Sequence, residues 1–181
     1  MSLFPFNNQN FYHSKIDKDI CKKTYEFIQQ TKESYKEQSW NCKILTSLNV
    51  TNNILNCKEM HEIRLNIISH IECFMHHRNT FFEGYLYDSW INIYKKDFFQ
   101  EFHTHESECE KFFSGVVYFT HENSNIEFNL IDKVSIKPEF SDIIIFDDHV
   151  PHRVCPNNID SERISLAFNY KKSNLWRGLR I

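Results

Sequence analysis

The sequence has no closely spaced pair of cysteines and no large excess of one charge. Its six cysteines occur singly, without a Cys-x-x-Cys spacing, so neither a zinc ribbon nor a thioredoxin-type redox pair is predicted. The formal net charge is -3, with acidic and basic residues interspersed, which leaves no basic stripe of the kind that neutralises nucleic-acid phosphates. We therefore expect no nucleic-acid partner.

Long apolar runs are also missing. Nothing approaches the roughly 20 consecutive apolar residues that cross a bilayer. The N-terminal stretch Met1–Phe6 lacks the basic lead and the apolar core of a secretory signal. Together with the scattered cysteines, these absences predict a cytoplasmic protein with reduced thiols and no membrane partner. The sequence predicts no oligomeric state.

The chain does have enough apolar material for one sizeable core. With 181 residues, of which 41% are hydrophobic and 15% aromatic, it is expected to fold rather than to be disordered. No internal repeat or low-complexity linker divides it. We therefore expect one domain over residues 1–181.

Two stretches show the 3.6-residue period of amphipathic helices. The first extends from Ser14 to about Lys36, with Ser14 and Asp17 as a capping pair. The second extends from about Lys58 to Arg78. We expect the histidines on or beside this second helix to be surface or core residues and not ligands: His61, His70, His76 and His77.

After Gly84 the pattern changes to short segments rich in aromatic and β-branched residues, which favour strands. About seven or eight strands after two helices predict a mainly β fold, a sandwich or barrel with the helices on one outer face. We assign helical support to about 14–80 and the barrel to about 84–171. The expected strands cover residues 85–94, 112–120, 126–130, 134–137, 142–146, 152–155 and 163–170, with a further short strand at 42–48.

One segment carries the pair His103 and His105. Successive side chains alternate faces along a strand, so the two imidazoles can share one ion. The apolar run 142–146 leads into His149 and His152, either of which could supply a third ligand. An open site with three protein ligands is typical of catalytic metals, non-haem iron(II) among them. A chance pair remains an alternative, because the chain has ten histidines.

Five segments of the chain form a joint pattern: Ser89-Trp90-Ile91-Asn92, Gln100-x-x-His103-x-His105, Ser114-Gly115-Val116-Val117-Tyr118, Phe146-x-x-x-x-Pro151-His152-Arg153-Val154 and residues 162–169. Together they resemble a small branch of the iron(II)- and 2-oxoglutarate-dependent oxygenases. The resemblance extends from about Trp90 to Tyr170 and implies a double-stranded β-helix, a cupin-like jelly-roll barrel, that uses Fe(II), 2-oxoglutarate and O2.

The resemblance implies that His103 and His152 bind the metal. His152 fits the distal position better than His149 does, because Arg163 then follows at the family's usual interval. The sequence departs from the family at His105, which stands where Asp or Glu is usual. A neutral imidazole there leaves the charge of the ion uncompensated, which should change its redox behaviour and its response to pH. Glu106 and Glu108 have the wrong strand parity to replace it, unless a bulge re-aims one of them.

Arg163 is the candidate for the co-substrate. Its planar guanidinium can hold the distal carboxylate of 2-oxoglutarate through two parallel charge-assisted hydrogen bonds. Ser165 shares that strand face and can donate its hydroxyl. The alternative for Arg163 is a surface ion pair with an acidic neighbour, Glu162 or Asp160. Asn92 and Tyr118 are expected either near the co-substrate or as ordinary buried polar residues.

The resemblance implies a dioxygenase, and specifically a hydroxylase. It would decarboxylate 2-oxoglutarate to succinate and hydroxylate an unidentified substrate, either a small molecule or a protein side chain. Two alternatives stay open. A cupin-type enzyme would use His103, His105, Glu110 and a later histidine without 2-oxoglutarate, and a jelly-roll binding module would not turn over at all.

Overall fold

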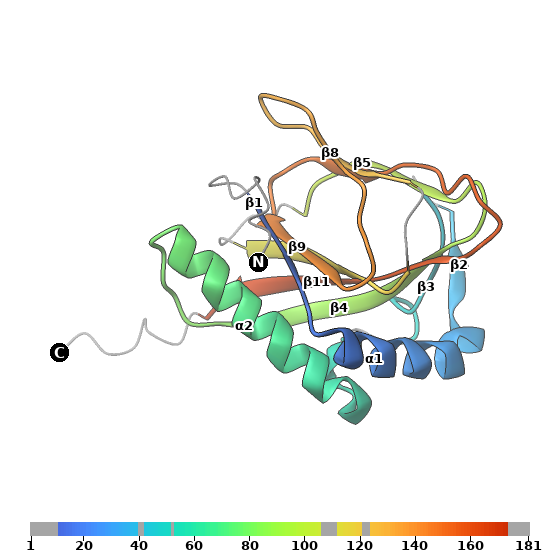
Figure 1. The fold of residues 1–181 in the computed structure, drawn as a ribbon, viewed down its shortest axis with the longest axis horizontal. Coiled ribbons are helices and arrows are strands. Elements are labelled where there is room, and N and C mark those ends of the chain that lie inside the picture. Colours follow the sequence, from blue (N-terminus) through green and yellow to red (C-terminus); the bar gives the residue numbers. More distant parts are fainter. Residues whose placement is uncertain (1–10, 40–41, 52, 106–111, 121–123, 174–181) are drawn as a thin grey trace.

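The computed structural model describes residues 11–39, 42–51, 53–105, 112–120 and 124–173, and two helices lie along one face of its curved antiparallel sheet (Figure 1). The helices are α1 (Lys18–Thr31) and α2 (His61–His77). The strands are β1 (Phe11–Lys15), β2 (Lys36–Gln38), β3 (Cys42–Thr46), β4 (Gly84–Tyr94), β5 (Phe99–His103), β6 (Phe112–Tyr118), β7 (Ile126–Phe128), β8 (Val134–Ile136), β9 (Asp142–Asp147), β10 (His152–Val154) and β11 (Arg163–Lys172).

Helix α1 begins later than the sequence pattern predicted. Asp17 is its N-cap, and its carboxylate accepts hydrogen bonds from the backbone amides of Asp19 and Ile20. Ser14 lies instead in β1, opposite Ile143 of β9. The prediction of a helix start at Ser14 is therefore wrong, because pairing with a distant strand holds residues 11–15 extended. The predicted second helix is confirmed as α2.

The strand order is β1-β9-β6-β11-β4-β3-β5-β10-β7-β8, with β2 paired to β3. Strand β3 connects the two halves of this arrangement. Its end, at Leu45 and Thr46, pairs with β4, whereas its start, at Cys42 and Lys43, pairs with β5. The sheet therefore turns at β3, which places β5 and β10 over the inner face of β4, β11 and β6.

Side-chain alternation separates the core from the site. Ile91 on β4 and Leu166 on β11 face the helices, where they belong to the same buried cluster as Ile63 and Ile67 of α2. Each buried aliphatic side chain of this kind contributes roughly 1.5–3 kcal/mol to folding. The alternate residues of the same strands therefore point to the opposite face, toward β5 and β10.

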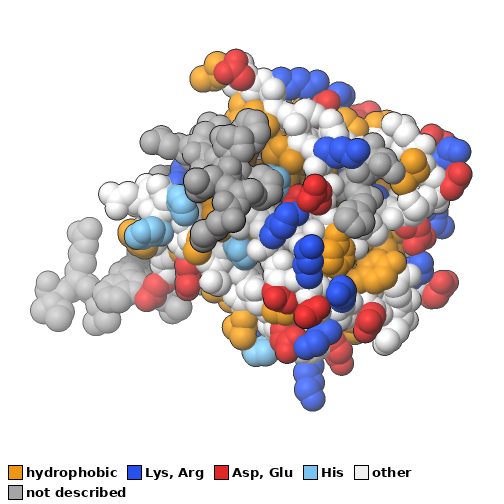
Figure 2. All heavy atoms as spheres, viewed as in Figure 1, with side chains coloured by type: hydrophobic (Ala, Val, Ile, Leu, Met, Phe, Trp, Pro, Cys, Tyr) orange, Lys and Arg blue, Asp and Glu red, His pale blue; other side chains and the backbone are white. Residues whose placement is uncertain are grey.

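The surface agrees with the even charge balance of the sequence. Basic and acidic side chains are interspersed on the face shown in Figure 2. Among the described residues, no helix has the length and apolar character needed to cross a membrane.

Candidate active site

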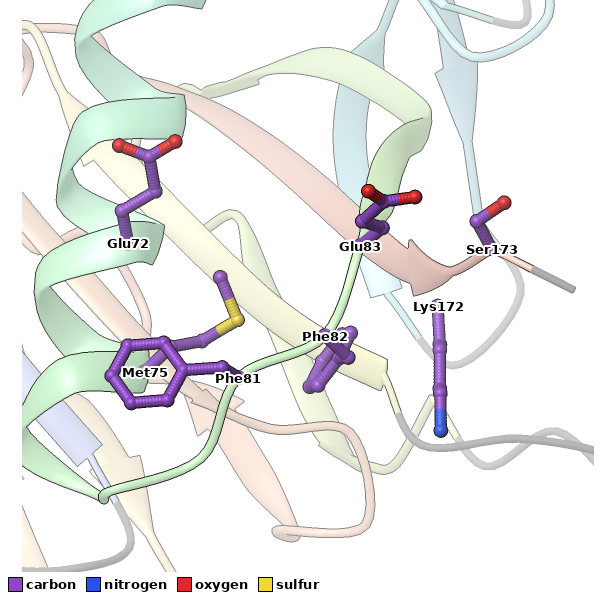
Figure 3. Close-up of a pocket in the computed structure, with 7 residues that line it drawn as sticks. All are labelled: Glu72, Met75, Phe81, Phe82, Glu83, Lys172 and Ser173. Carbon is purple, nitrogen blue, oxygen red and sulfur yellow. The ribbon is translucent and has the colours of Figure 1, made fainter. Parts of the chain in front are cut away.

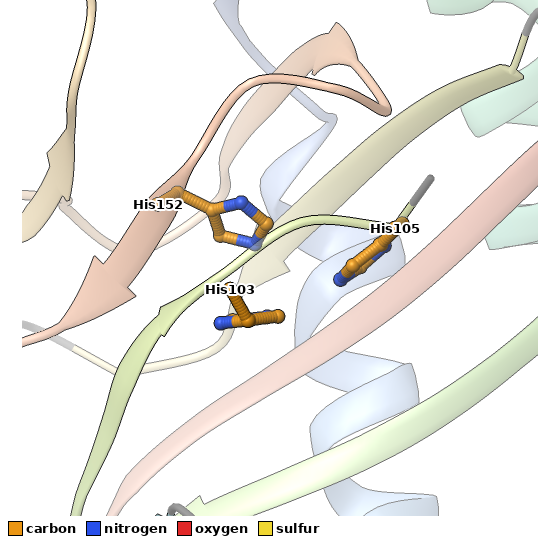
Figure 4. A group of neighbouring side chains, drawn as sticks. All are labelled: His103, His105 and His152. Atoms are coloured by element: carbon orange, nitrogen blue, oxygen red, sulfur yellow. The ribbon is translucent and has the colours of Figure 1, made fainter. Parts of the chain in front are cut away.

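Three histidines meet between the two halves of the sheet. His103 at the end of β5 lies directly opposite His152 at the start of β10. His105 follows two residues after β5, where its backbone amide donates to the Asp148 carbonyl at 2.9 Å. One ring nitrogen from each of the three lies within 4.8 Å of the others, and the rings point toward one another (Figure 4). The predicted convergence of the three imidazoles is thus seen in the structure.

Hydrogen bonds select the tautomer of the two strand histidines. The Nδ1 of His103 lies 2.9 Å from the Glu101 carbonyl oxygen, and that of His152 lies 3.0 Å from the Val150 carbonyl oxygen. A carbonyl can only accept, so each Nδ1 carries the proton and each Nε2 presents a lone pair. Partners of this kind hold metal-binding histidines in orientation.

His105 has side-chain partners instead. Its Nδ1 lies 2.8 Å from the Asn169 side-chain oxygen and 2.9 Å from the Ser114 hydroxyl. Asn169 and Ser114 are register partners on β11 and β6. This ring is therefore oriented by side chains of β6 and β11, whereas the other two are oriented by backbone carbonyls two residues before them in the chain.

Burial keeps the three imidazoles neutral. It lowers the pKa of His103 and of His105 below the usual 6.5. The pKa of His152 is lowered furthest, first by burial and then by the nearness of His103 and His105. Metal ligands must be deprotonated, so this environment favours ion binding near neutral pH.

The structure places the competing ligands elsewhere or leaves them undescribed. The side chain of His149 is 65% exposed and lies 3.7 Å from the Asp148 carboxylate, outside the cluster. His70 faces Tyr12, whose hydroxyl lies 2.9 Å from its Nδ1. Glu110 of the cupin-type alternative lies outside the described residues, as do Glu106 and Glu108.

Arg163 is buried, with only 2% of its surface exposed. Its Nη1 donates to the Ser124 hydroxyl at 2.6 Å. Its acidic neighbours are engaged elsewhere, with Glu162 bonded to Lys32 at 2.8 Å and Asp160 bonded to Lys96 at 3.0 Å. The alternative of a surface ion pair for Arg163 is therefore wrong.

On the inner face of β4, β11 and β6, side chains surround this guanidinium in two cross-strand rows, one at the level of Arg163 and one at the level of Ser165. Arg163 lies opposite Tyr94, and Ser165 lies between Asn92 on β4 and Tyr118 on β6. The guanidinium carbon stands 5.4 Å from the ring centre of Tyr94 and 5.5 Å from that of Tyr118. Ser165 shares the face of Arg163, as strand alternation predicts.

A single cavity connects these rows to the histidines. The Asn92 side-chain oxygen is buried without a hydrogen-bond partner among the described residues, so it is a polar group that a ligand or water could satisfy. Every residue proposed from the sequence as a metal or co-substrate contact lines the cavity: His103, His105, His152, Arg163, Ser165, Asn92 and Tyr118.

Three of the other residues that line this cavity were assigned no role from the sequence but contact the site. The Tyr94 hydroxyl donates to the Gln100 side-chain oxygen at 3.1 Å, and the Gln100 amide lies 3.2 Å from the Nε2 of His103. The ring centre of Trp90 lies 6.1 Å from that of His105. Strand parity with Asn92 could have indicated Trp90 and Tyr94, whereas Gln100 required the fold.

A larger cavity, of about 740 Å³, lies away from the histidines, between the end of α2, the segment before β4 and the end of β11 (Figure 3). It shares no lining residue with the histidine cavity. None of its described lining residues belongs to a cluster of metal-binding side chains. Size alone therefore does not locate the chemistry of this chain.

Comparison with known proteins points to one superfamily. A family model described as "Putative 2OG-Fe(II) oxygenase" matches residues 121–169. A prolyl-4-hydroxylase from Pseudomonas putida has a TM-score of 0.70 at 13% identity, covering 91% of this chain and 94% of that chain. This chain has the jelly-roll fold of the 2-oxoglutarate- and iron(II)-dependent oxygenases. The fold class and the superfamily resemblance predicted from the sequence are confirmed.

Two further structures of this fold were solved with bound molecules. A prolyl hydroxylase from Trichoplax adhaerens, in complex with a peptide of hypoxia inducible factor, has a TM-score of 0.70 at 12% identity, covering 92% of this chain and 85% of that chain. HygX from Streptomyces hygroscopicus, with nickel, 2-oxoglutarate and hygromycin B bound, has a TM-score of 0.69 at 9% identity, covering 93% and 85%. A sequence search of curated proteins found no match.

Proposed function

We propose that this chain is an iron(II)- and 2-oxoglutarate-dependent dioxygenase that hydroxylates an as yet unidentified substrate. One observation carries the proposal: three neutral imidazoles and a buried guanidinium line the same cavity of a jelly-roll barrel. A purely structural metal site would have no use for the guanidinium. A cupin-type enzyme that does not use 2-oxoglutarate would leave Arg163 without a role.

The donor set fits a ferrous ion. Each histidine has an oxygen partner at Nδ1, so Nε2 would be the metal-binding atom, and the Nε2 of His103 would exchange its contact with the Gln100 amide for the ion. Three nitrogen ligands leave positions open for other ligands, as non-haem iron(II) oxygenases require. When bound, iron supplies the oxygen chemistry that couples decarboxylation of 2-oxoglutarate to hydroxylation of a C–H bond.

The main sheet would bind and orient the co-substrate. Arg163 would donate two parallel hydrogen bonds to the distal carboxylate, and the Ser165 hydroxyl, on the same face, would donate a third. The rings of Tyr94 and Tyr118 lie beside the guanidinium and would help to hold it in place. Because Arg163 and the three histidines line one cavity, the co-substrate would span from Arg163 to the histidines.

Apolar side chains would keep the reacting end dry. The ring of Phe146 packs edge-on against His152, with centroids 4.6 Å apart. Ile126 and Val154 line the same cavity and are buried. Excluding water strengthens the polar contacts made by Arg163 and limits side reactions.

We propose a peptide side chain or a small molecule as the substrate. Solved structures of this fold include one in complex with a peptide and one with hygromycin B bound.

The test is succinate formation by iron-loaded protein with 2-oxoglutarate and O2, since slow uncoupled turnover needs no primary substrate. We expect succinate from the wild type and from the matched control His149→Ala, but none above background from His152→Ala. Metal binding without succinate formation in the wild type would contradict the proposal and favour a binding module.

A further inference from the structure

An irregularity in strand β5 places Gln100 beside His103. Residues three apart in a regular strand point to opposite faces, as Gln100 and His103 would. Here His103 pairs with His152 and Gln100 pairs with Val154, so three residue steps on β5 match two on β10. The extra residue makes a β-bulge, a feature that re-aims side chains and is frequent beside active sites. Both side chains consequently line the histidine cavity.

Two hydrogen bonds fix the direction of the Gln100 amide. Its oxygen accepts from the Tyr94 hydroxyl at 3.1 Å, and its nitrogen lies 3.2 Å from the Nε2 of His103. The Nδ1 of His103 carries the ring proton because it faces the Glu101 carbonyl, so Nε2 accepts from the amide. A reversed amide would place its oxygen against that lone pair, and two acceptors would face each other. Gln100 therefore donates to the atom of His103 that would bind metal.

We propose that Gln100 is a positioning residue that occupies the lone pair of His103 in the metal-free protein and thereby lowers the affinity of the site for an ion. An imidazole nitrogen has one lone pair, which cannot accept from the amide and bind an ion at the same time. This inference rests on the proposed metal site and adds a defined partner for His103 in the empty state. Tyr94, which is 1% exposed, holds the amide in place, so an incoming ion must displace an anchored donor.

The first test removes the donor by the exchange Gln100→Met, which keeps a side chain of similar length. We expect Zn(II) titration to show a rise in affinity of about 2- to 10-fold, the equivalent of one ordinary hydrogen bond. A residue that merely supports the site would give a fall instead. The matched control is Gln38→Met, because Gln38 is also a half-buried strand residue but pairs with Ile44 on β3. It should bind Zn(II) as the wild type does.

A second variant removes the anchor of the amide. Tyr94→Phe deletes the hydroxyl that Gln100 accepts from and keeps the ring beside Arg163. We expect a rise in Zn(II) affinity that is smaller than in Gln100→Met, because the amide is still present but no longer held. Adding Tyr94→Phe to Gln100→Met should raise the affinity no further, since Tyr94 acts through Gln100. Tyr94→Phe also carries the test if Gln100→Met does not fold.

Nitrogen-15 NMR of histidine-labelled, metal-free protein examines the contact itself. A ring nitrogen that accepts a hydrogen bond resonates upfield of one that does not. We therefore expect the Nε2 resonance of His103 to move downfield in Gln100→Met and to stay in place in Gln38→Met.

Each outcome decides a separate point. A Zn(II) affinity in Gln100→Met equal to or below that of the wild type would overturn the proposal and leave the proposed function standing. An unmoved Nε2 resonance would overturn it too. If neither the wild type nor the variants bind an ion, the proposed metal site fails instead, and the Nε2 resonance still decides whether Gln100 occupies the lone pair of His103.

Discussion

Replacing Arg163 with alanine should weaken 2-oxoglutarate binding and leave metal binding intact. The guanidinium is 2% exposed and lies against two tyrosine rings, so its hydrogen bonds to a carboxylate would form out of water. Removing one partner of a buried charged pair costs about 2–5 kcal/mol. The dissociation constant should therefore rise roughly 30- to 4,000-fold.

Isothermal titration of Mn(II)-loaded protein under anaerobic conditions measures this effect. The comparison ligand is 2-oxobutyrate, which has the same 2-keto-carboxylate end as 2-oxoglutarate but no distal carboxylate. The wild type should prefer 2-oxoglutarate by about the factor above, and Arg163→Ala should bind both acids with similar affinity. If Arg163→Ala keeps the wild-type preference, the distal carboxylate is bound elsewhere and the reasoning is wrong.

Arg153→Ala is the matched control. Arg153 also lies over an aromatic ring, with its guanidinium carbon 4.9 Å from the ring centre of Phe102. It is next to His152 in the sequence, but its ion pair with Glu127 is on the outer surface. Its removal should leave both keto acids bound as in the wild type.

Three further predictions concern the metal, the packing and the pH response. His103→Ala should abolish stoichiometric Co(II) binding in a titration while His149→Ala retains it, and equal binding by both variants would contradict the proposed ligand set. Gly115→Ala should lower the melting temperature, because a Cβ there would lie 2.2 Å from the ring of Phe168, at a cost of about 1–3 kcal/mol; an unchanged melting temperature would contradict this close approach. Burial lowers the pKa of His70 below 6.5, so the unfolded chain binds the extra proton and stability falls as the pH drops below 6.5. In urea titrations of metal-free protein, His70→Gln should therefore lose less unfolding free energy than the wild type between about pH 7.5 and pH 5.5, and an equal loss would contradict this sign.

The local sequence pattern was sufficient to predict a helix or strand where that element buries one continuous face. The apolar period of α2 and the alternation along β4 and β11 predicted those elements closely. The local pattern was insufficient where a strand is held by pairing with a strand distant in the sequence. Strand β1 is held by β9, and β2 is a short strand beside β3, so neither leaves a clear signal in its own residues.

The same distinction applies to the site. His103, His105 and Arg163 could be chosen from spacing and from the chemistry of their side chains. The choice of His152 over His149 becomes firm only when β10 pairs with β5 and places His152 opposite His103. The supporting residues, such as Asn169, depend on cross-strand register, which no local pattern encodes.

The most direct test of the proposed site is an anomalous-difference map from crystals grown with Mn(II) and 2-oxoglutarate. We expect one strong peak bound by the Nε2 atoms of His103, His105 and His152, with the keto acid extending from it to Arg163. A peak bound by a carboxylate in place of His105, or a keto acid that does not contact Arg163, would contradict this expectation.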